Sequence, residues 1–156
     1  MVWRGSTDVK DRIFAALVYS IPLSIALSFS QFVIQYVPQA LIAVIDIFLL
    51  PLNIVQRIIP FGDIVIFFAL FLLVVRNERI KHFIRFNTMQ SLLLDIALTL
   101  LGLGLGILGS NLITAVLSSV IFMVTLTVCI YSIIQCALGK YPDIPAISEA
   151  VYTQVP

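Results

Sequence analysis

Charged side chains are scarce in this sequence of 156 residues. Only 11% of the residues are charged and 61% are hydrophobic, and the mean hydropathy is +1.13. Such values exclude an ordinary water-soluble domain. No charge occurs between Ile96 and Gly139, whereas one membrane crossing needs only about 20 apolar residues. The sequence therefore predicts an integral membrane protein in which this stretch forms a two-helix hairpin, and it gives no support for nucleic-acid binding.

The residue types that catalytic and metal sites need are also few. His82 is the only histidine, and we expect it to be solvated at the membrane interface. Cys129 and Cys136 are seven residues apart in one apolar segment, so their Cα atoms should lie about 10 Å apart, too far for a disulfide. We expect both to be packing residues. Since no catalytic set, phosphate-binding loop or metal-spaced cluster can be assembled, we predict no enzyme, cofactor or metal site.

Long apolar segments are what the sequence has in abundance. They predict an all-α, polytopic membrane protein with four transmembrane helices in a single domain, residues 1–156. The spans are expected at about 13–36, 61–76, 86–108 and 112–138, between tails at 1–12 and 139–156. Because the C-terminal tail is polar and contains prolines, we expect it to be irregular.

Two of these spans have unusual features. Pro22 removes a backbone hydrogen bond within the first span and should kink it, and the hydroxyls of Ser20 and Ser24 are close enough to satisfy the freed carbonyl. The second span, with Asp63 near its start, covers only somewhat over 20 Å, short of the roughly 30 Å hydrocarbon core. We therefore expect arginines at its end to snorkel, or the bilayer to thin locally.

Residues 39–58 are predicted to form an amphipathic helix. At about 100° per residue, four polar residues fall on nearly one line of that helix, namely Gln39, Asp46, Asn53 and Arg57. The helix can lie at the membrane interface, with Pro51 bending it, or pack its polar stripe inward against a wet cavity. We favour the interfacial placement.

The basic residues predict the orientation of the chain. If 39–58 does not cross the membrane, eight of the nine Lys and Arg residues share one side, namely Arg4, Lys10, Arg12, Arg76, Arg79, Lys81, Arg85 and Lys140. A fifth crossing would divide them five against four. Since cytoplasmic loops carry an excess of Lys and Arg, we predict four spans with both termini on the cytoplasmic or stromal side. The basic loop, Arg76 to Arg85, should then contact anionic lipid or, alternatively, a partner.

The third span carries a polar stripe close to this basic loop. Asn87, Ser91 and Asp95 follow one another at four-residue spacing, with Gln90 alongside. A carboxylate within the membrane costs roughly 2.5 to 3.5 kcal/mol on insertion scales, so Asp95 should face protein or water. Three roles remain open for the stripe: hydrogen bonding between helices, which we favour, a part in a hydrophilic conduit, and proton coupling.

The packing of the last two spans can also be predicted. If they form an antiparallel hairpin about Ser110, Thr125 and Thr127 should lie near the Asp95 carboxyl group. Gly102 and Gly106 form a GxxxG pair, which lets helix backbones approach closely in lipid, so we expect these glycines to pack against another helix.

Three stretches of the chain carry a family resemblance: DRIFAALVYSIPL from Asp11 to Leu23, FFALFLLVVRNERIKHFIRFNTMQSLLLDIAL from Phe67 to Leu98, and YPDIPAISEAVY from Tyr141 to Tyr152. They resemble the twenty-kilodalton, channel-forming subunit family of the translocon at the inner envelope membrane of chloroplasts, with its cyanobacterial and plastid-encoded relatives. The middle stretch is the most specific of the three, because its order of charge, aromatic, amide and carboxylate is not expected of an arbitrary hydrophobic hairpin.

The resemblance implies a four-helix subunit of a protein translocon. Its partners would be the lipid bilayer, other translocon subunits or further copies of itself, and a translocating polypeptide. The membrane would be the chloroplast inner envelope, or the plasma or thylakoid membrane of a cyanobacterium, where the family's role is unsettled. Since plant members begin with a transit peptide and this chain does not, we expect a cyanobacterial protein. The alternative function is a small-solute or ion channel or transporter that uses Asp95.

Overall fold

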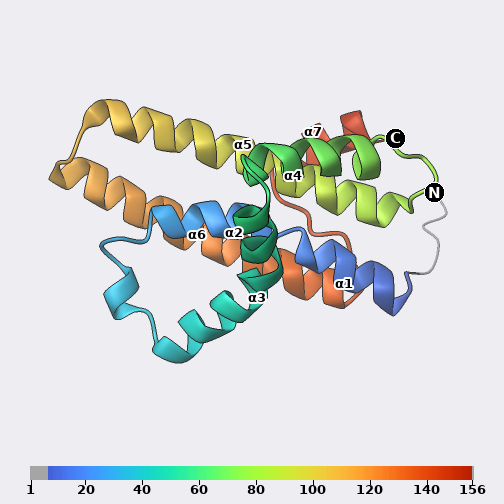
Figure 1. The fold of residues 1–156 in the computed structure, drawn as a ribbon, viewed down its shortest axis with the longest axis horizontal. Helices are drawn as coiled ribbons and strands as arrows, with labels where there is room; N and C mark the ends of the chain where they lie inside the picture. Colours follow the sequence, from blue (N-terminus) through green and yellow to red (C-terminus); the bar gives the residue numbers. More distant parts are fainter. Residues whose placement is uncertain (1–6, 156) are drawn as a thin grey trace.

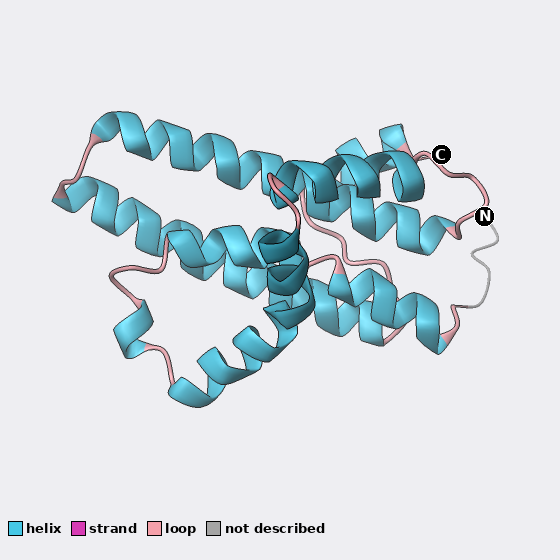
Figure 2. Cartoon of the chain, in the orientation of Figure 1, coloured by secondary structure: helices cyan, strands magenta, loops and turns pink. Residues whose placement is uncertain are grey.

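The structure, a computed structural model, describes residues 7–155, and within this range the chain is helical with no strand. The helices are α1 (Val9–Leu17), α2 (Ser20–Ser28), the 3-10 helix η1 (Ile34–Tyr36), α3 (Gln39–Ile58), α4 (Gly62–Leu70), the π-helix η2 (Phe71–Val75), α5 (His82–Leu108), α6 (Leu112–Ala137) and α7 (Ile147–Gln154). Figures 1 and 2 show their arrangement. The predicted all-α class is confirmed.

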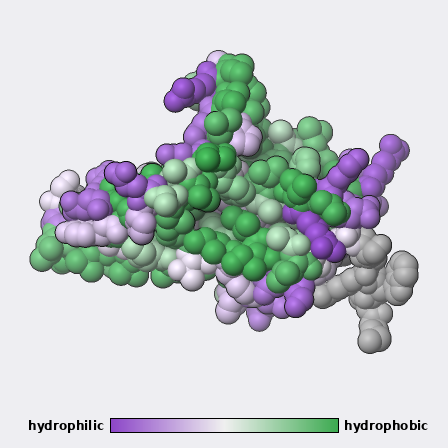
Figure 3. Space-filling model, turned by 90° about the horizontal axis from the view of Figure 1, so that it is seen from below, coloured by the Kyte–Doolittle hydropathy of each residue, from purple (hydrophilic) through white to green (hydrophobic). Residues whose placement is uncertain are grey.

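Four helical segments are long and apolar enough to cross a membrane: Val9–Ser28, Gln39–Ile58, His82–Leu108 and Leu112–Ala137. Apolar side chains cover much of the face seen in Figure 3, and hydrophilic ones lie toward its two ends and on the part that projects at the top. A polytopic membrane protein is therefore confirmed. The four segments include α3, which we predicted at the interface, and leave out the shorter Gly62–Val75 helix. Which helices cross thus stays a prediction.

The stretch without charged residues, Ile96 to Gly139, forms the expected hairpin, which consists of the second half of α5 and all of α6. Gly109 takes a positive φ of 71° at the turn, and the Asn111 side chain accepts a hydrogen bond from the Thr114 amide at 2.9 Å, which caps α6. However, α1 and α2 pack against both long helices and separate them over much of their length (Figure 1). Small buried residues such as Ala15 and Ala26 permit this close approach.

The predicted neighbours of Asp95 are therefore wrong. The Thr127 hydroxyl is exposed and donates to the Met123 carbonyl of its own helix at 2.8 Å. Thr125 is buried on α6, whereas the cleft that contains Asp95 is lined from α2, α3, α4 and α5. A prediction from the hairpin alone could not show that another helix pair would enter between its two helices.

The first span is shorter than the predicted 13–36. The regular helix is interrupted between Leu17 and Ser20, and α2 ends at Ser28, after which turns and η1 lead to α3. The Ser30 hydroxyl donates to the Leu27 carbonyl at 2.7 Å, so a side chain competes there with the regular helical bonds. The chain therefore leaves the bundle well before the far end of α5.

The α3 helix crosses the bundle at a steep angle and does not run along it (Figure 1). Its buried face is formed by Ile45, Leu49 and Leu52, which belong to the same core cluster as Leu23 and Ala26 of α2. The predicted polar stripe, from Gln39 to Arg57, is exposed. The stripe therefore does not pack inward, which leaves the interfacial placement as our prediction.

One end of the bundle holds the start of α1, the loop before α5 and the C-terminal segment (Figure 1). The Lys81 ammonium forms ion pairs with Asp8 at 3.0 Å and Asp11 at 2.7 Å, and His82 contacts the Val155 carbonyl oxygen. Seven of the eight basic residues predicted to share a side are described, whereas Arg4 lies outside the described residues. This arrangement agrees with the predicted common side for both termini.

The C-terminal tail is not irregular as predicted. Residues 147–154 form α7, and Val151 and Val155 are buried against α5 in a cluster with Phe86 and Leu92. The apolar residues of α7 recur at a helical spacing. The prediction of an irregular tail gave more weight to the two prolines that precede α7. The tail is thus part of the packed structure.

Candidate functional site

Three residues of the predicted stripe join α5 to its neighbours from within the core. Asn87 is 0% exposed, and its Oδ1 accepts hydrogen bonds from the Tyr19 hydroxyl at 3.0 Å and from the Cys136 thiol at 3.1 Å. Its Nδ2 donates to the Phe83 carbonyl at 2.8 Å. Because Tyr19 precedes α2 and Cys136 belongs to α6, this amide connects three parts of the chain.

Gln90 connects the same network to the C-terminal segment. Its Nε2 donates to the Tyr19 hydroxyl and to the Pro142 carbonyl, both at 3.1 Å. Its Oε1 accepts from the Ser148 hydroxyl at 3.0 Å, and that hydroxyl accepts from the Ile144 amide at 2.8 Å. All of these groups are buried. The amide therefore holds the C-terminal segment against the bundle through bonds that exclude water.

Ser91 satisfies the carbonyl that Pro22 leaves without its regular partner. A residue other than proline at position 22 would donate its amide to the Val18 carbonyl, four residues earlier. Instead, the Ser91 hydroxyl donates to that oxygen at 2.6 Å. We had expected Ser20 or Ser24 to do so, but the Ser24 hydroxyl donates to the Ile21 carbonyl at 2.8 Å. The missing bond of one helix is therefore replaced from another.

A Ser91→Ala substitution should therefore destabilise the fold. It leaves the buried Val18 carbonyl with only a long bond from the Ile21 amide at 3.2 Å, and we expect a loss of about 1–2 kcal/mol in the free energy of unfolding. Thermal unfolding of the purified chain in detergent measures the loss. Ser28→Ala is the matched control, because the Ser28 hydroxyl is exposed and bonds within its own helix. Equal effects of the two substitutions would contradict this role.

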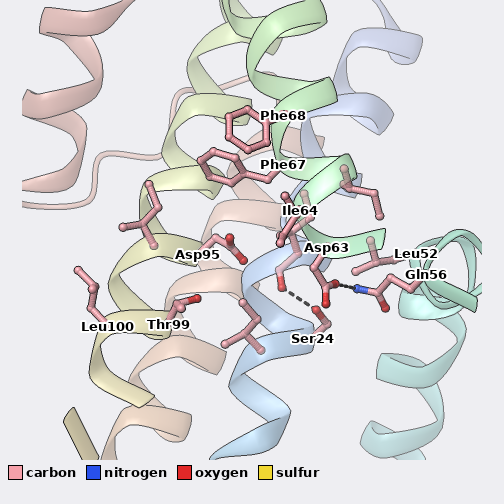
Figure 4. A pocket seen from close by; sticks show the side chains of 14 residues that line it. Ser24, Leu52, Gln56, Asp63, Ile64, Phe67, Phe68, Asp95, Thr99 and Leu100 are labelled. Carbon is pink, nitrogen blue, oxygen red and sulfur yellow. Dashed lines mark hydrogen bonds between the residues drawn. The ribbon is translucent and has the colours of Figure 1, made fainter. Parts of the chain in front are cut away.

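Asp95 differs from the other three residues because it faces a cleft of about 450 Å³. Four helices contribute polar side chains to the lining: Ser24 from α2, Gln56 from α3, Asp63 from α4, and Asp95 and Thr99 from α5 (Figure 4). The Gln56 amide donates a hydrogen bond to the Asp63 carboxylate. Within residues 7–155, the Asp95 carboxylate makes no hydrogen bond or ion pair, so it is available to a ligand or to water.

The cleft lies halfway along the bundle. Asp95 follows the first residue of α5 by thirteen positions and precedes the last by thirteen. In Figure 1, α4 begins near this level and runs toward the end that holds the start of α1 and α7. Phe68 at the rim is 54% exposed, and Asp63 is also exposed. The cleft therefore opens on the side of the bundle at a depth that would correspond to the middle of the bilayer.

Gly62 allows the polar parts of this cleft to meet. A Cβ atom at this position would lie 2.8 Å from the Gln56 Cα atom, closer than nonbonded atoms approach. Only glycine can therefore place the start of α4 against the last turns of α3, where the Gln56 side chain reaches Asp63.

The four basic residues of the predicted loop fall into two pairs with different surroundings. Arg76 and Arg79 are exposed. In contrast, the Lys81 ammonium donates hydrogen bonds to the carboxylates of Asp11 and Asp8 at the start of α1, and these bonds, the one to Asp11 first, raise the pKa of Lys81 above the usual value. The Arg85 guanidinium donates through Nε to the Val75 carbonyl at 2.9 Å. Two of the four basic residues thus hold the loop to the bundle, and contact of the other two with lipid or a partner stays a prediction.

His82 is not solvated as we expected. Its Nδ1 lies 3.0 Å from the Tyr141 hydroxyl and its Nε2 lies 3.1 Å from the Val155 carbonyl oxygen. Since a carbonyl only accepts, Nε2 carries a proton and donates it to the Val155 carbonyl oxygen. A single histidine next to basic residues suggested exposure, but the folding of the C-terminal segment over it determined its surroundings.

The two predicted packing glycines have different surroundings. A Cβ atom at Gly102 would lie 3.3 Å from the Phe29 ring, so this glycine makes room for the end of the first span. At Gly106 nothing lies within 4 Å of such an atom. Contact of Gly106 with a helix of another chain stays a prediction.

Sequence reasoning missed several residues of these two sites. Tyr19, Ser148 and Gln56 lie far from the third span in sequence, and no spacing rule relates them to it. Asp63 was singled out only as a helix-terminal acid. In the part of the chain that the structure describes, no group of three His, Cys, Asp or Glu side chains could hold a metal ion.

Comparison with known proteins relates this architecture to one family. A family model described as chloroplast import apparatus Tic20-like matches residues 8–151. A Tic20 family protein of Synechocystis sp. is 40% identical over 160 residues, 99% of each chain. Protein TIC 20-v, chloroplastic, of Arabidopsis thaliana is 34% identical over 96% of this chain and 73% of its own length. The Tic20 family protein Ycf60 of Pyropia yezoensis is 31% identical over 97% and 80%. The chain therefore belongs to the Tic20 family of the chloroplast import apparatus.

Proposed function

We propose that this chain is the membrane subunit of a protein translocon in which the cleft beside Asp95 forms part of the path of a polypeptide. Membership of an import-apparatus family supports the general role. The finer role rests on one observation, a polar cleft halfway along the bundle whose Asp95 carboxylate makes no hydrogen bond or ion pair within residues 7–155.

A translocating chain needs polar surroundings at this depth. Its backbone amides and carbonyls cannot be satisfied by hydrocarbon, and each unsatisfied group is costly there. Asp95 and Thr99 on one wall and Gln56 and Asp63 on the other offer acceptors and donors. The network of Asn87, Gln90 and Ser91 does not line the path in this proposal but keeps α5 in a fixed position beside it.

The cleft is too small and too open to enclose a polypeptide by itself. A volume of about 450 Å³ holds a few side chains, and its rim is exposed. We therefore infer that other translocon subunits or further copies of this chain complete the enclosure, with Arg76 and Arg79 at the lipid or partner surface.

Photo-crosslinking from position 95 tests the proposal. A photoreactive amino acid would replace Asp95 in membranes that contain a preprotein arrested during translocation, and we expect it to capture the arrested polypeptide. The same residue in place of Thr127 is the control, because Thr127 is exposed on α6 and the cleft is lined from α2, α3, α4 and α5. No capture from position 95, or equal capture from both positions, would contradict the proposed path.

The available carboxylate also fits a second function, a small-solute or ion channel that uses Asp95. In that case liposomes containing the purified chain should pass ions or small solutes, and Asp95→Asn should abolish this flux. Solute flux without capture of a polypeptide would favour this function over the translocon path.

A further inference from the structure

The apolar helix that begins at the cleft, α4 with η2, is much shorter than α5. The α5 helix contains 27 residues and is about 40 Å long at 1.5 Å per residue. On the side of the cleft, α4 and η2 contain nine and five residues, or about 21 Å. Their first turn carries Asp63, which lines the cleft together with Asp95 at the middle of α5. The helix formed by α4 and η2 therefore has about half the length of α5.

The end of α3 places further polar groups at the same level. Arg57 is exposed and follows Gln56, which lines the cleft, while Asn53 is exposed one turn earlier. Ionised side chains at the centre of a bilayer are costly, and a bilayer thins beside a short apolar surface at modest cost. Headgroups and water on the α3 side should therefore descend to the level of the cleft.

We infer that this chain has a second activity, the movement of lipid headgroups between the two leaflets along the thinned bilayer beside the cleft. A headgroup crosses a bilayer slowly because it must leave water for hydrocarbon. Here the remaining hydrocarbon distance is short, and the Asp63, Asp95, Thr99 and Gln56 side chains can replace water at its midpoint (Figure 4).

The charges that line the cleft determine which lipids it favours, because Arg57 lies outside this lining. Its lining residues include two aspartates and neither Lys nor Arg. Carboxylates repel a headgroup with net negative charge and attract hydroxyl or amine groups. The favoured lipids therefore carry uncharged or zwitterionic headgroups, and anionic lipids cross more slowly.

Fluorescent lipids in vesicles test this activity with the full chain alone. The purified protein would be reconstituted into phosphatidylcholine vesicles containing a trace of fluorescent phosphatidylcholine, and dithionite added outside bleaches the outer leaflet. We expect the inner-leaflet probe to become accessible at least about tenfold faster than in protein-free vesicles, equivalent to about 1.4 kcal/mol of barrier. A rate equal to that of protein-free vesicles would overturn the inference.

A trapped water-soluble fluorophore distinguishes lipid movement from leakage. If that fluorophore is bleached at the same rate, dithionite has entered through a pore, and the inference is overturned. If it stays fluorescent while the lipid probe is lost, the inference is supported.

Headgroup charge provides a second readout that does not depend on a drastic substitution. Fluorescent phosphatidylglycerol should cross more slowly than fluorescent phosphatidylcholine, and the nearly isosteric double variant Asp63→Asn, Asp95→Asn should reduce that difference. Thr99→Val should slow crossing, whereas Thr127→Val, the same change on α6, should not. Equal rates for the two headgroups in the unmodified chain, or equal effects of the two threonine substitutions, would overturn the role of the cleft.

Discussion

Replacement of Asn87 by alanine is expected to lower the free energy of unfolding by about 2–4 kcal/mol, because it removes buried hydrogen bonds and leaves a small cavity. The Tyr19 hydroxyl loses its acceptor and the Phe83 carbonyl loses a donor, both in an interior without exposure to water. Denaturant or thermal unfolding of the purified chain in mixed micelles measures the change.

Thr88→Ala is the matched control for this substitution. Thr88 is also 0% exposed, but its hydroxyl donates to the Ile84 carbonyl of its own helix. We expect it to cost less than half as much. In a double-mutant cycle with Tyr19→Phe, Asn87→Ala should cost less than in the unmodified chain, with a coupling of about 0.5–3 kcal/mol. Additive effects would show that the two side chains do not depend on each other.

Replacement of Val151 by aspartate should release the C-terminal segment from the bundle. Val151 is 0% exposed and packs in the cluster with Phe86 and Leu92. The substitution loses the burial of a valine and places a carboxylate in an apolar site, so we expect local opening to become easier by more than about 3 kcal/mol, or over a hundredfold. Hydrogen exchange of residues 141–155 in lipid nanodiscs measures the loss of protection.

Thr153→Asp provides the same charge change on the solvent side of α7. Thr153 is exposed and bonds only within its helix, so protection of the C-terminal segment should change little. If Val151→Asp leaves the segment as protected as Thr153→Asp does, α7 is not held by its buried face. If both substitutions release it, the charge rather than the burial is responsible.

Much of the fold could be predicted because membrane insertion depends on local composition. A charge-free stretch of this length must satisfy its backbone internally, so Ile96 to Gly139 could only form a helical hairpin. The amphipathic pattern of α3 could also be predicted from the sequence. The helical period alone places Gln39 and Arg57 on one face of the helix, whatever its neighbours are. The distribution of basic residues also predicted that the start of α1 and the C-terminal segment lie at one end (Figure 1).

The C-terminal segment shows why local composition was insufficient elsewhere. Prolines and polar residues predicted an irregular tail, yet Ser148 is buried against Gln90 and Tyr141 contacts His82. These contacts join residues that are more than fifty positions apart. The residue pattern of the C-terminal segment alone does not show which residues of α5 it will contact, and the pattern of α5 does not show this either.

By itself, the sequence determined the class of protein, the hairpin, the amphipathic helix and the polar character of the stripe from Asn87 to Asp95, because each depends on residues within one or two helical turns. Only the tertiary structure divided that stripe, since α1 and α2 entered between α5 and α6 and buried Asn87, Gln90 and Ser91 against Tyr19, Pro142 and Val18. Asp95, one turn further along α5, faces Asp63 and Gln56 across the cleft instead. The physical reason is that burial depends on which helices become neighbours, and lipid-exposed and protein-facing sides of a membrane helix can be equally apolar.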